Sequence, residues 1–533
     1  MSIRCNGRAL AAAAAAFAAW VLCSWTASAA PPSVVPFTPG LRAELDAYLE
    51  GALVRFEVPG AAVALVREGK IAYVRGLGVR DLETRAPVGA ETRFMLGSLS
   101  KPLTALMAAT LVEDGLLDWD APVSDVLPSF ALSDPAATPR VRLRNLFGHT
   151  SGVARRADYA WVGVPPSPFG LVRIASTQPL RAAPGETFEY SNLMFAIGGF
   201  AAARAAGAAL EDRALRRGYA RLMGERVFDR VGMPRTTLDF ERALHTSDHA
   251  QPYSFSPLGG GWAPVLEFER FAVLAPSGGV WSDAADMARY LVVQIRQGLN
   301  PEGKRVVSSE ALLETQRAQI AVPGFANGSY GLGMGMVESG GLTQLAHDGS
   351  TNGFGSRLIA VPTLGWGVVV LANRGATRPF LDAVERYVTA LVYGQARLPD
   401  DDLVARDRAF RVTLERAFAD TSPVDPVQAA AHAGQYESGV RVSVHGQDLI
   451  LRTPSGERPF RALAGEPERY SSVGPVDTRM IAVFSQRTDG TALLSLGYPN
   501  GQGEFQAFVV LARQAPGRAT GTADERPRQS GAR

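Results

Sequence analysis

The order of strand-like and helix-like segments constrains the fold of this chain most. Two apolar, β-branched runs at residues 61–66 and 71–74, joined through Glu68-Gly69, predict a β-hairpin near the N-terminus. Strand-like runs return much later, at residues 331–337, 357–361 and 365–371. Apolar residues at helical spacing predict helices at residues 41–52, 103–111, 192–226 and 377–393. If the hairpin and the late strands share one sheet, the two ends of this domain close on each other around a helical middle.

Composition excludes several classes of protein. The chain has 533 residues, of which 46% are hydrophobic and 20% charged, as in globular proteins. Its formal net charge is +2 and its arginines form no basic run, so we expect no nucleic-acid partner. After the first thirty residues, no segment is apolar for long enough to span a membrane. A chain of this length predicts more than one domain.

The first 29 residues have the features of a secretory signal peptide. Arg4 and Arg8 precede a short apolar run at residues 9–22, and Ala27-Ser28-Ala29 is a small-x-small cleavage signal. An uncleaved anchor is the alternative. Both cysteines of the chain lie inside this segment, so the mature protein should contain no disulfide and no thiolate metal site. We therefore expect a periplasmic or secreted product.

The C-terminal part differs in character from the rest. Residues 396–430 are charged and proline-punctuated, which indicates a linker or connecting helix. Residues 431–513 contain only short strand-like runs separated by turns, which predicts a small β-sheet or β-barrel domain. These runs lie at residues 440–444, 449–452, 480–484, 492–496 and 505–511. The tail at residues 514–533 is polar and rich in proline and glycine, and we expect it to be disordered.

A serine and a lysine three residues apart are the first candidates for chemistry. Ser98 and Lys101 stand at the start of a predicted helix, where positions i and i+3 share a face, so the lysine amine can reach the hydroxyl. Lysine is scarce in this chain, and the arginines that replace it cannot act as bases. The competing interpretation is a solvated lysine near a helix start.

Two segments in the middle of the chain add polar candidates. Tyr190 could relay a proton and Asn192 could hold a substrate amide, although Ser191 or Asn192 could simply cap the following helix. His149, in the segment His-Thr-Ser-Gly, invites a Ser-His-Asp interpretation. We favour a structural histidine whose ring is hydrogen-bonded inside a loop.

A glycine-rich segment late in the chain is the last candidate. Residues 347–350 read His-Asp-Gly-Ser, and glycines follow at positions 353 and 355. Glycines beside a strand allow a substrate to approach the backbone, and the Ser350 N–H could bind a developing oxyanion. A turn with a surface histidine is the competing interpretation.

The order of these motifs resembles that of a known family. The motifs are Ser98-x-x-Lys101, Tyr190-x-Asn192 and His347-x-Gly349. Together they resemble the serine β-lactamase and penicillin-recognising enzymes of the class C type, including D-alanyl-D-alanine carboxypeptidases, D-aminopeptidases and β-lactamase-like esterases. Further similar stretches lie at residues 58–61, 92–94, 149–152, 184–185 and 276–279. The resemblance covers residues 36–395. It implies an α+β fold, with an antiparallel sheet flanked by helices and an all-helical region, followed here by the small all-β domain.

The resemblance also implies a role for each matching residue. Ser98 would form an acyl-enzyme, with Lys101 and Tyr190 sharing the proton transfers. The backbone N–H groups of Ser98 and Ser350 would form the oxyanion hole. The remaining matching positions would contact the substrate: Asn192, His347, Gly349 and Ser350. No cofactor and no metal is expected.

His347 departs from the pattern of the lactamases, which have lysine at that place. A lysine is a permanent cation suited to a substrate carboxylate, whereas a histidine is mostly neutral near pH 7. The resemblance therefore implies an esterase or D-peptidase acting on a small molecule or a D-amino-acid peptide, ahead of a class C β-lactamase. A catalytically silent penicillin-binding-like protein is a further alternative. A Ser-His-Asp enzyme of the α/β-hydrolase type is disfavoured, because the chain has no Gly-x-Ser-x-Gly elbow.

Overall fold

The computed structural model describes residues 33–155, 167–256, 261–265, 272–453, 456–473, 480–499 and 505–514. The predicted signal peptide, residues 1–29, lies outside these residues, as do residues 515–533 of the predicted tail. Among the described residues, no helix combines the length and the apolarity needed to cross a bilayer.

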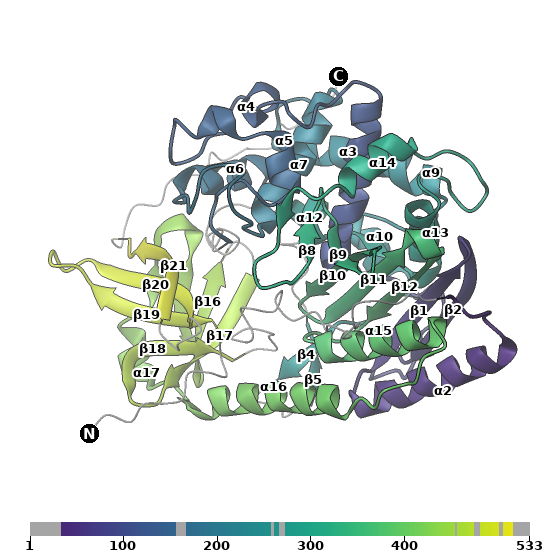
Figure 1. Ribbon diagram of the computed structural model, residues 1–533. Coiled ribbons are helices and arrows are strands. Elements are labelled where there is room, and N and C mark those ends of the chain that lie inside the picture. The colour runs from purple at the N-terminus through teal and green to yellow at the C-terminus, as the bar shows by residue number, and fades with distance from the viewer. Residues whose placement is uncertain are drawn as a thin grey trace, which may run out of the picture.

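An antiparallel eight-stranded sheet organises the larger domain (Figure 1). Its strand order is β2 (Lys70–Gly78), β1 (Gly60–Arg67), β12 (Trp366–Ala372), β11 (Phe354–Val361), β10 (Leu342–Thr351), β9 (Gly335–Ser339), β8 (Gly328–Tyr330) and β7 (Ile320–Ala321). The N-terminal hairpin β1–β2 therefore pairs with the late strand β12, with Val63 opposite Val370. The condition for closure is thus met: the hairpin and the late strands share one sheet, and the two ends of the domain close on each other.

Both faces of the sheet are buried along β1, which explains why this strand is apolar from its first residue to Val66. Ala62, Ala64 and Val66 face one core, whereas the alternating residues Val63 and Leu65 face the other. The second core lies under α2 (Pro39–Arg55) and α15 (Arg378–Val392). A strand that alternates between two apolar layers needs no polar positions.

The first core joins the sheet to the helical region between β2 and β7 (Figure 1). The longer helices of this region are α3 (Ser100–Glu113), α6 (Pro168–Thr177), α7 (Asn192–Ala205), α8 (Asp212–Met223) and α13 (Ala284–Ile295). Its short helices are α4 (Val123–Val126), α5 (Leu143–Phe147), α9 (Asp229–Val231), α10 (Phe240–His245), α12 (Ala275–Gly278) and α14 (Ser309–Thr315). Two small strand pairs complete it, β3 (Phe94–Met95) with β6 (Trp281–Ser282), and β4 (Tyr253–Ser256) with β5 (Gly261–Pro264). Helix α3 is buried from its first residue to Leu111, as its apolar composition requires.

The smaller domain is all-β apart from its connections. Helix α16 (Asp401–Ala419) leads to it, and α17 (Pro426–Ala430) precedes its main strands. These strands are β13 (Thr421–Ser422), β14 (Gly434–Gln435), β15 (Arg441–His445), β16 (Asp448–Thr453), β17 (Gly456–Leu463), β18 (Glu466–Ser472), β19 (Ile481–Gln486), β20 (Ala492–Pro499) and β21 (Phe505–Ala512). These strands form one sheet. The sheet is curled, because an isolated bridge between Tyr436 and Arg513 joins its two ends. The predicted α+β fold followed by a small all-β domain is confirmed.

Two details of the sequence-based prediction were wrong. Of the strand expected at residues 331–337, only residues 335–337 belong to a strand, β9. Residues 331–334 form the turn between β8 and β9, where Gly333 has φ +79° and lies beside the backbone of Lys101. Strands β17 and β18 were missed, because they carry charged residues and proline where a strand pattern requires apolar alternation. The segment at residues 396–430 is mostly the helix α16.

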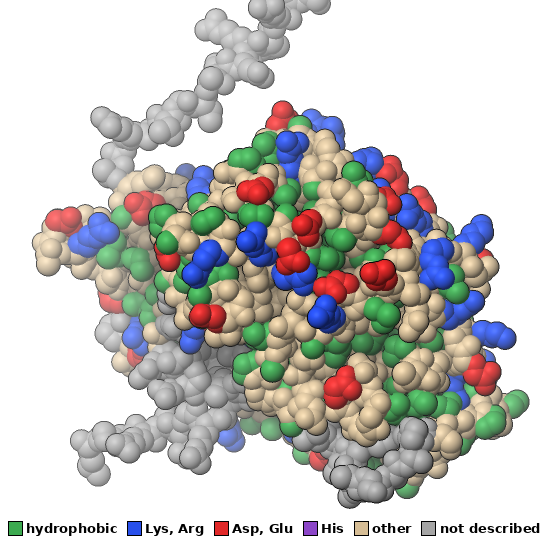
Figure 2. Space-filling view, turned by 45° about the horizontal axis from the view of Figure 1, so that its top comes forward, with side chains coloured by type: hydrophobic (Ala, Val, Ile, Leu, Met, Phe, Trp, Pro, Cys, Tyr) green, Lys and Arg blue, Asp and Glu red, His purple; other side chains and the backbone are tan. Residues whose placement is uncertain are grey.

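Charge is mixed on the face of the molecule that Figure 2 shows. On the face shown in Figure 2, basic and acidic side chains are interspersed with apolar ones. This agrees with the small net charge of the chain.

Candidate active site

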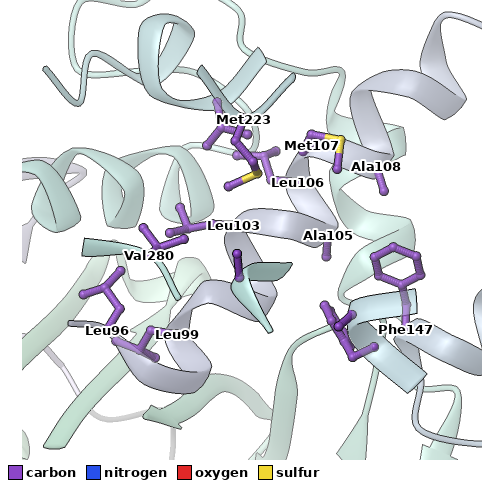
Figure 3. Close-up of a cluster of buried hydrophobic side chains, with 14 of the residues drawn as sticks. Leu96, Leu99, Leu103, Ala105, Leu106, Met107, Ala108, Phe147, Met223 and Val280 are labelled. Carbon is purple, nitrogen blue, oxygen red and sulfur yellow. The ribbon is translucent and has the colours of Figure 1, made fainter. Parts of the chain in front are cut away.

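Ser98 lies in a tight turn whose flanking residues are buried in the core. The turn is the 3-10 helix η1 (Gly97–Leu99), and α3 follows it directly. Leu96 and Leu99 are fully buried, and Leu96 donates its N–H to the Val280 carbonyl at 2.8 Å. Figure 3 shows both leucines and Val280 packed around the start of α3. Ser98 itself is partly exposed. The turn thus presents a serine hydroxyl from a rigid base.

Lys101 points back from the first turn of α3 toward Ser98. Its Nζ donates hydrogen bonds to three neutral oxygens: Ser98 Oγ at 3.0 Å, Asn192 Oδ1 at 2.6 Å and the Ser277 carbonyl at 2.8 Å. The side chain is fully buried. The expected i, i+3 contact is therefore present, and the solvated-lysine interpretation is wrong. An amine at this distance is positioned to exchange a proton with the hydroxyl.

Tyr190 and Asn192 approach Lys101 from the start of α7. Ser191 is the N-cap of this helix, with its Oγ accepting the Met194 N–H at 3.2 Å. Ser191 therefore caps the helix, and the Asn192 side chain remains to accept from Lys101. The substrate contact of Asn192 and the proton relay by Tyr190 stay predictions. The Tyr190 ring centroid is 4.7 Å from Lys101 Nζ. Two distant parts of the chain thus meet at one point, the first with Ser98 and Lys101 and the second with Tyr190 and Asn192.

His149 supports this group from behind. Its backbone is left-handed, with φ +58°, and its Nδ1 accepts the Ser191 N–H at 3.2 Å. The ring packs against Tyr190, with centroids 4.2 Å apart. Burial, together with the charge of Lys101, holds the pKa of His149 well below its usual range. The geometry fits the structural role expected for this histidine, because its ring is buried and hydrogen-bonded.

His347 is buried rather than placed on a surface turn. Its Nδ1 lies 2.7 Å from the carbonyl of Asp348, and its Nε2 lies 2.9 Å from the Tyr330 hydroxyl. Because a carbonyl oxygen only accepts, Nδ1 carries the proton and Nε2 accepts from Tyr330. Burial and the nearby Lys101 lower the pKa of His347 to about 4. The site therefore has a neutral imidazole at this position near pH 7.

Strand β10 and the serine turn are in backbone contact through two glycines. A Cβ added to Gly349 would lie 2.1 Å from the Leu96 carbonyl oxygen. A Cβ added to Gly97 would lie 2.8 Å from the Ser350 nitrogen. Only glycine allows this approach, which brings the Ser350 backbone beside the turn that carries Ser98. This is the place predicted for the oxyanion hole.

The opposite face of β10 is anchored by charge. Arg357 on β11 makes bonds from Nε and Nη2 to Asp348, at 2.7 and 2.9 Å, and its Nη1 reaches Asp382 and Glu385 of α15. Burial alone would raise the pKa of Asp348, but Arg357 holds it below its usual range. In residues 347–350, histidine therefore faces the site and aspartate fixes the strand to α15.

Two contributors were missed by sequence reasoning. The carbonyl of Ser277 binds Lys101, and Tyr330 binds His347, which lies 17 residues further along the chain. Ser277 belongs to a segment whose resemblance was noted without a role, whereas no local spacing links Tyr330 to the site. Within the described residues, no three His, Cys, Asp or Glu side chains are grouped so that they could hold a metal ion.

The fold brings a serine into contact with a buried lysine at the junction of sheet and helix. This arrangement is that of a serine hydrolase. The model of the family described as Beta-lactamase matches residues 45–392, more than half of the chain. The chain belongs to the Beta-lactamase family. The assignment of individual residues to steps of the reaction stays a prediction.

Known relatives are distant. An unguisins hydrolase of Aspergillus campestris is 27% identical over 373 residues, which cover 67% of this chain and 65% of that protein. The chain thus spans less than two thirds of that relative. Penicillin-binding protein 4 of Amycolatopsis lactamdurans is 27% identical over 384 residues, covering 71% of this chain and 93% of its own length.

A solved structure has a similar fold over most of the chain. The octameric penicillin-binding protein homologue from Pyrococcus abyssi superposes with a TM-score of 0.59 at 22% identity. The match covers 89% of this chain and 100% of that one, so it extends beyond the Beta-lactamase region. At this identity the similarity concerns the fold alone.

Proposed function

We propose that this protein is an exported serine hydrolase that cleaves an ester or amide bond of a small molecule or D-amino-acid peptide through an acyl-enzyme at Ser98. The observation that carries the proposal is the 3.0 Å contact between Lys101 Nζ and Ser98 Oγ inside a buried site. In its neutral form Lys101 directs its free electron pair to Ser98 Oγ and accepts the hydroxyl proton as Ser98 attacks the carbonyl carbon. Tyr190, packed against Lys101, shares the return of that proton to the leaving group. Water then cleaves the acyl-enzyme.

The neutral state of His347 favours esters and D-peptides over β-lactams. A substrate carboxylate at this strand would meet an imidazole whose two nitrogens are engaged by Tyr330 and by the Asp348 carbonyl. A permanent cation, as lysine supplies, is absent from this position.

Export is proposed from the sequence of residues 1–29. The N-terminal sequence of the mature protein, purified from a membrane-free fraction, tests it.

A hydrolysis panel tests the reaction. Short-chain aryl esters, D-amino-acid amides and a chromogenic cephalosporin are offered to wild type, Ser98→Ala and Lys101→Met. We expect ester or amide turnover by wild type, and a loss of about 10³-fold or more in both variants. Lys70→Met is the matched control, because Lys70 is exposed on β2.

Covalent labelling separates the alternatives. Wild type should react with a fluorophosphonate probe, and Ser98→Ala should not. Activity retained in Ser98→Ala would dismiss Ser98 as the nucleophile. Turnover of the cephalosporin ahead of all esters and amides would favour the lactamase alternative, whereas absent labelling and turnover would favour the silent binding protein.

A further inference from the structure

Arg155 places a guanidinium at the Tyr190 side of the site. It follows the loop that carries His149, and its side chain is partly buried. The guanidinium carbon lies 5.9 Å from the Tyr190 ring centroid. Lys101 Nζ lies 4.7 Å from the same ring. The arginine is therefore part of the surroundings of the proposed proton relay.

The neighbouring carboxylate is already engaged. Glu189 accepts the backbone N–H of Arg155 through Oε2 at 3.3 Å, and its Oε1 pairs with Arg181 at 3.2 Å. In the part of the chain that the structure describes, no carboxylate lies within ion-pair distance of the Arg155 guanidinium. Among the described residues, the positive charge of Arg155 is thus not held in an ion pair and can serve a ligand.

The other basic groups near the site are not available. Lys101 is bonded to Ser98, Asn192 and Ser277. His347 is neutral near pH 7, and its ring is held by Tyr330. Arg357 lies on the far face of the sheet among carboxylates of β10 and α15. Arg155 also acts on His149, where its charge disfavours protonation. Of the basic groups that the structure describes near the site, the available one therefore lies on the loop side, next to Tyr190.

We propose that Arg155 determines specificity by binding a carboxylate of the substrate, so that the enzyme prefers esters or amides that carry an anionic group on the Tyr190 side of the scissile bond. This inference rests on the proposed function. A guanidinium matches a carboxylate with two parallel N–H donors and keeps its charge at every physiological pH. The partial burial of Arg155 strengthens such a pair relative to one in water.

Two ester pairs test this inference, because the anionic group could belong to either product. The first pair is 4-nitrophenyl hydrogen adipate against its neutral methyl ester, with the charge on the acyl chain. The second is the butyrate ester of 4-hydroxybenzoate against that of methyl 4-hydroxybenzoate, with the charge on the leaving group. The ratio of kcat/KM for charged over neutral ester is compared between variants, so that intrinsic reactivity cancels.

Arg155→Gln should lower this ratio about 10- to 100-fold in one pair, the effect expected of one charge-assisted hydrogen-bonded pair. Arg155→Lys should restore part of it. Arg181→Gln is the matched control, since Arg181 is exposed and paired with Glu189, and it should leave the ratio unchanged. An unchanged ratio in both pairs for Arg155→Gln would overturn the inference. Equal losses of kcat/KM on charged and neutral esters, with a shifted pH profile, would also overturn the inference. Arg155 would then act on Tyr190 and not on the substrate.

Wild type alone supplies a second measurement should Arg155→Gln fold poorly. Raising the salt concentration from about 0.05 to about 0.5 M should lower the ratio in the affected pair, because salt screens the attraction. A ratio that does not respond to salt would contradict the inference. If wild type hydrolyses none of the four esters, the proposed function fails and the inference with it. If Ser98-dependent turnover is present without preference, only the inference fails.

Discussion

His347 is the residue whose surroundings most change its chemistry. In the sequence it stands beside an aspartate, a neighbour that would favour the protonated imidazole. In the structure Asp348 faces Arg357 instead, and the ring lies buried near Lys101 with Tyr330 as a donor. These contacts favour the neutral form, because each positive charge or donor near Nε2 opposes a proton there.

The depressed pKa of His347 predicts how stability depends on pH. The unfolded histidine binds a proton near pH 6.5, whereas the folded one does so only near pH 4. Between these values the unfolded chain holds the extra proton, so the free energy of unfolding falls as pH decreases, by up to about 1.4 kcal/mol per pH unit. Urea unfolding of wild type and His347→Asn between about pH 7 and pH 4 measures this slope.

The variant should show the shallower slope, whatever its stability at pH 7. His149 has a lowered pKa and contributes with the same sign, so His149→Asn serves as the parallel case. Equal slopes in wild type and His347→Asn would mean that the imidazole is not kept neutral by the fold.

At the level of elements, the site depends on how β10 meets the turn η1. The Ser356 hydroxyl of β11 donates to the Leu96 carbonyl at 2.7 Å, and Gly349 passes close to the same carbonyl. Strand and turn are thus joined on the side where Ser350 lies. The predicted oxyanion hole requires this spacing, because its two N–H groups come from different elements.

Gly349→Ala should damage the site by separating these elements. Its Cβ would lie 2.1 Å from the Leu96 carbonyl oxygen and 2.2 Å from Ser356 Oγ, so β10 must move away. We expect kcat/KM for an aryl ester to fall at least about 100-fold, as when one oxyanion donor is lost. Gly224→Ala is the control, since nothing lies within 4 Å of its added Cβ. Comparable activity of the two variants, both folded by circular dichroism, would refute the predicted contact.

Across the whole molecule, α16 ties the two domains together. Arg374, at the end of β12, is fully buried, bonds to Asp407 of α16 at 2.7 Å and lies over the Trp262 ring at 4.2 Å. Apolar side chains of α16 also pack with both the β4–β5 hairpin and the small domain, forming a cluster of Phe255, Trp262, Phe410, Leu414, Phe418 and Val473. The connecting segment is therefore a structural part of the molecule rather than a passive linker.

Removing Arg374 should destabilise the protein strongly. Among the described residues, Arg374→Met leaves the buried Asp407 carboxylate with the more distant Arg411 as its ion-pair partner, and breaking such a buried pair costs about 3–5 kcal/mol. The double variant Arg374→Met with Asp407→Leu should recover part of this loss. Arg221→Met, which removes an exposed helical pair, should change stability by less than about 1 kcal/mol. Thermal and urea unfolding compare the three, and equal effects of Arg374→Met and Arg221→Met would contradict this role.

The sequence by itself determined the features that depend on neighbours along the chain. The β1–β2 hairpin, the helix with Ser98 and Lys101 at its start, and most strands of the small domain follow from periodicity and turn residues. Closure of the sheet was open in the sequence: the order of the hairpin and the late strands allowed it only if β1 and the late strands shared one sheet, and the pairing of β1 with β12 decided it.

The tertiary structure decided the environment of each polar group. The Tyr330 contact to His347, the Ser277 carbonyl on Lys101 and the position of Arg155 beside Tyr190 join residues far apart in the chain. No spacing encodes such contacts, since they follow from how sheet, helices and loops pack together. Strands β17 and β18 were missed for a related reason: their polar sequences become strands through pairing with β16 and β19. Local sequence thus sets which groups are present, and packing sets their charge, their partners and their exposure.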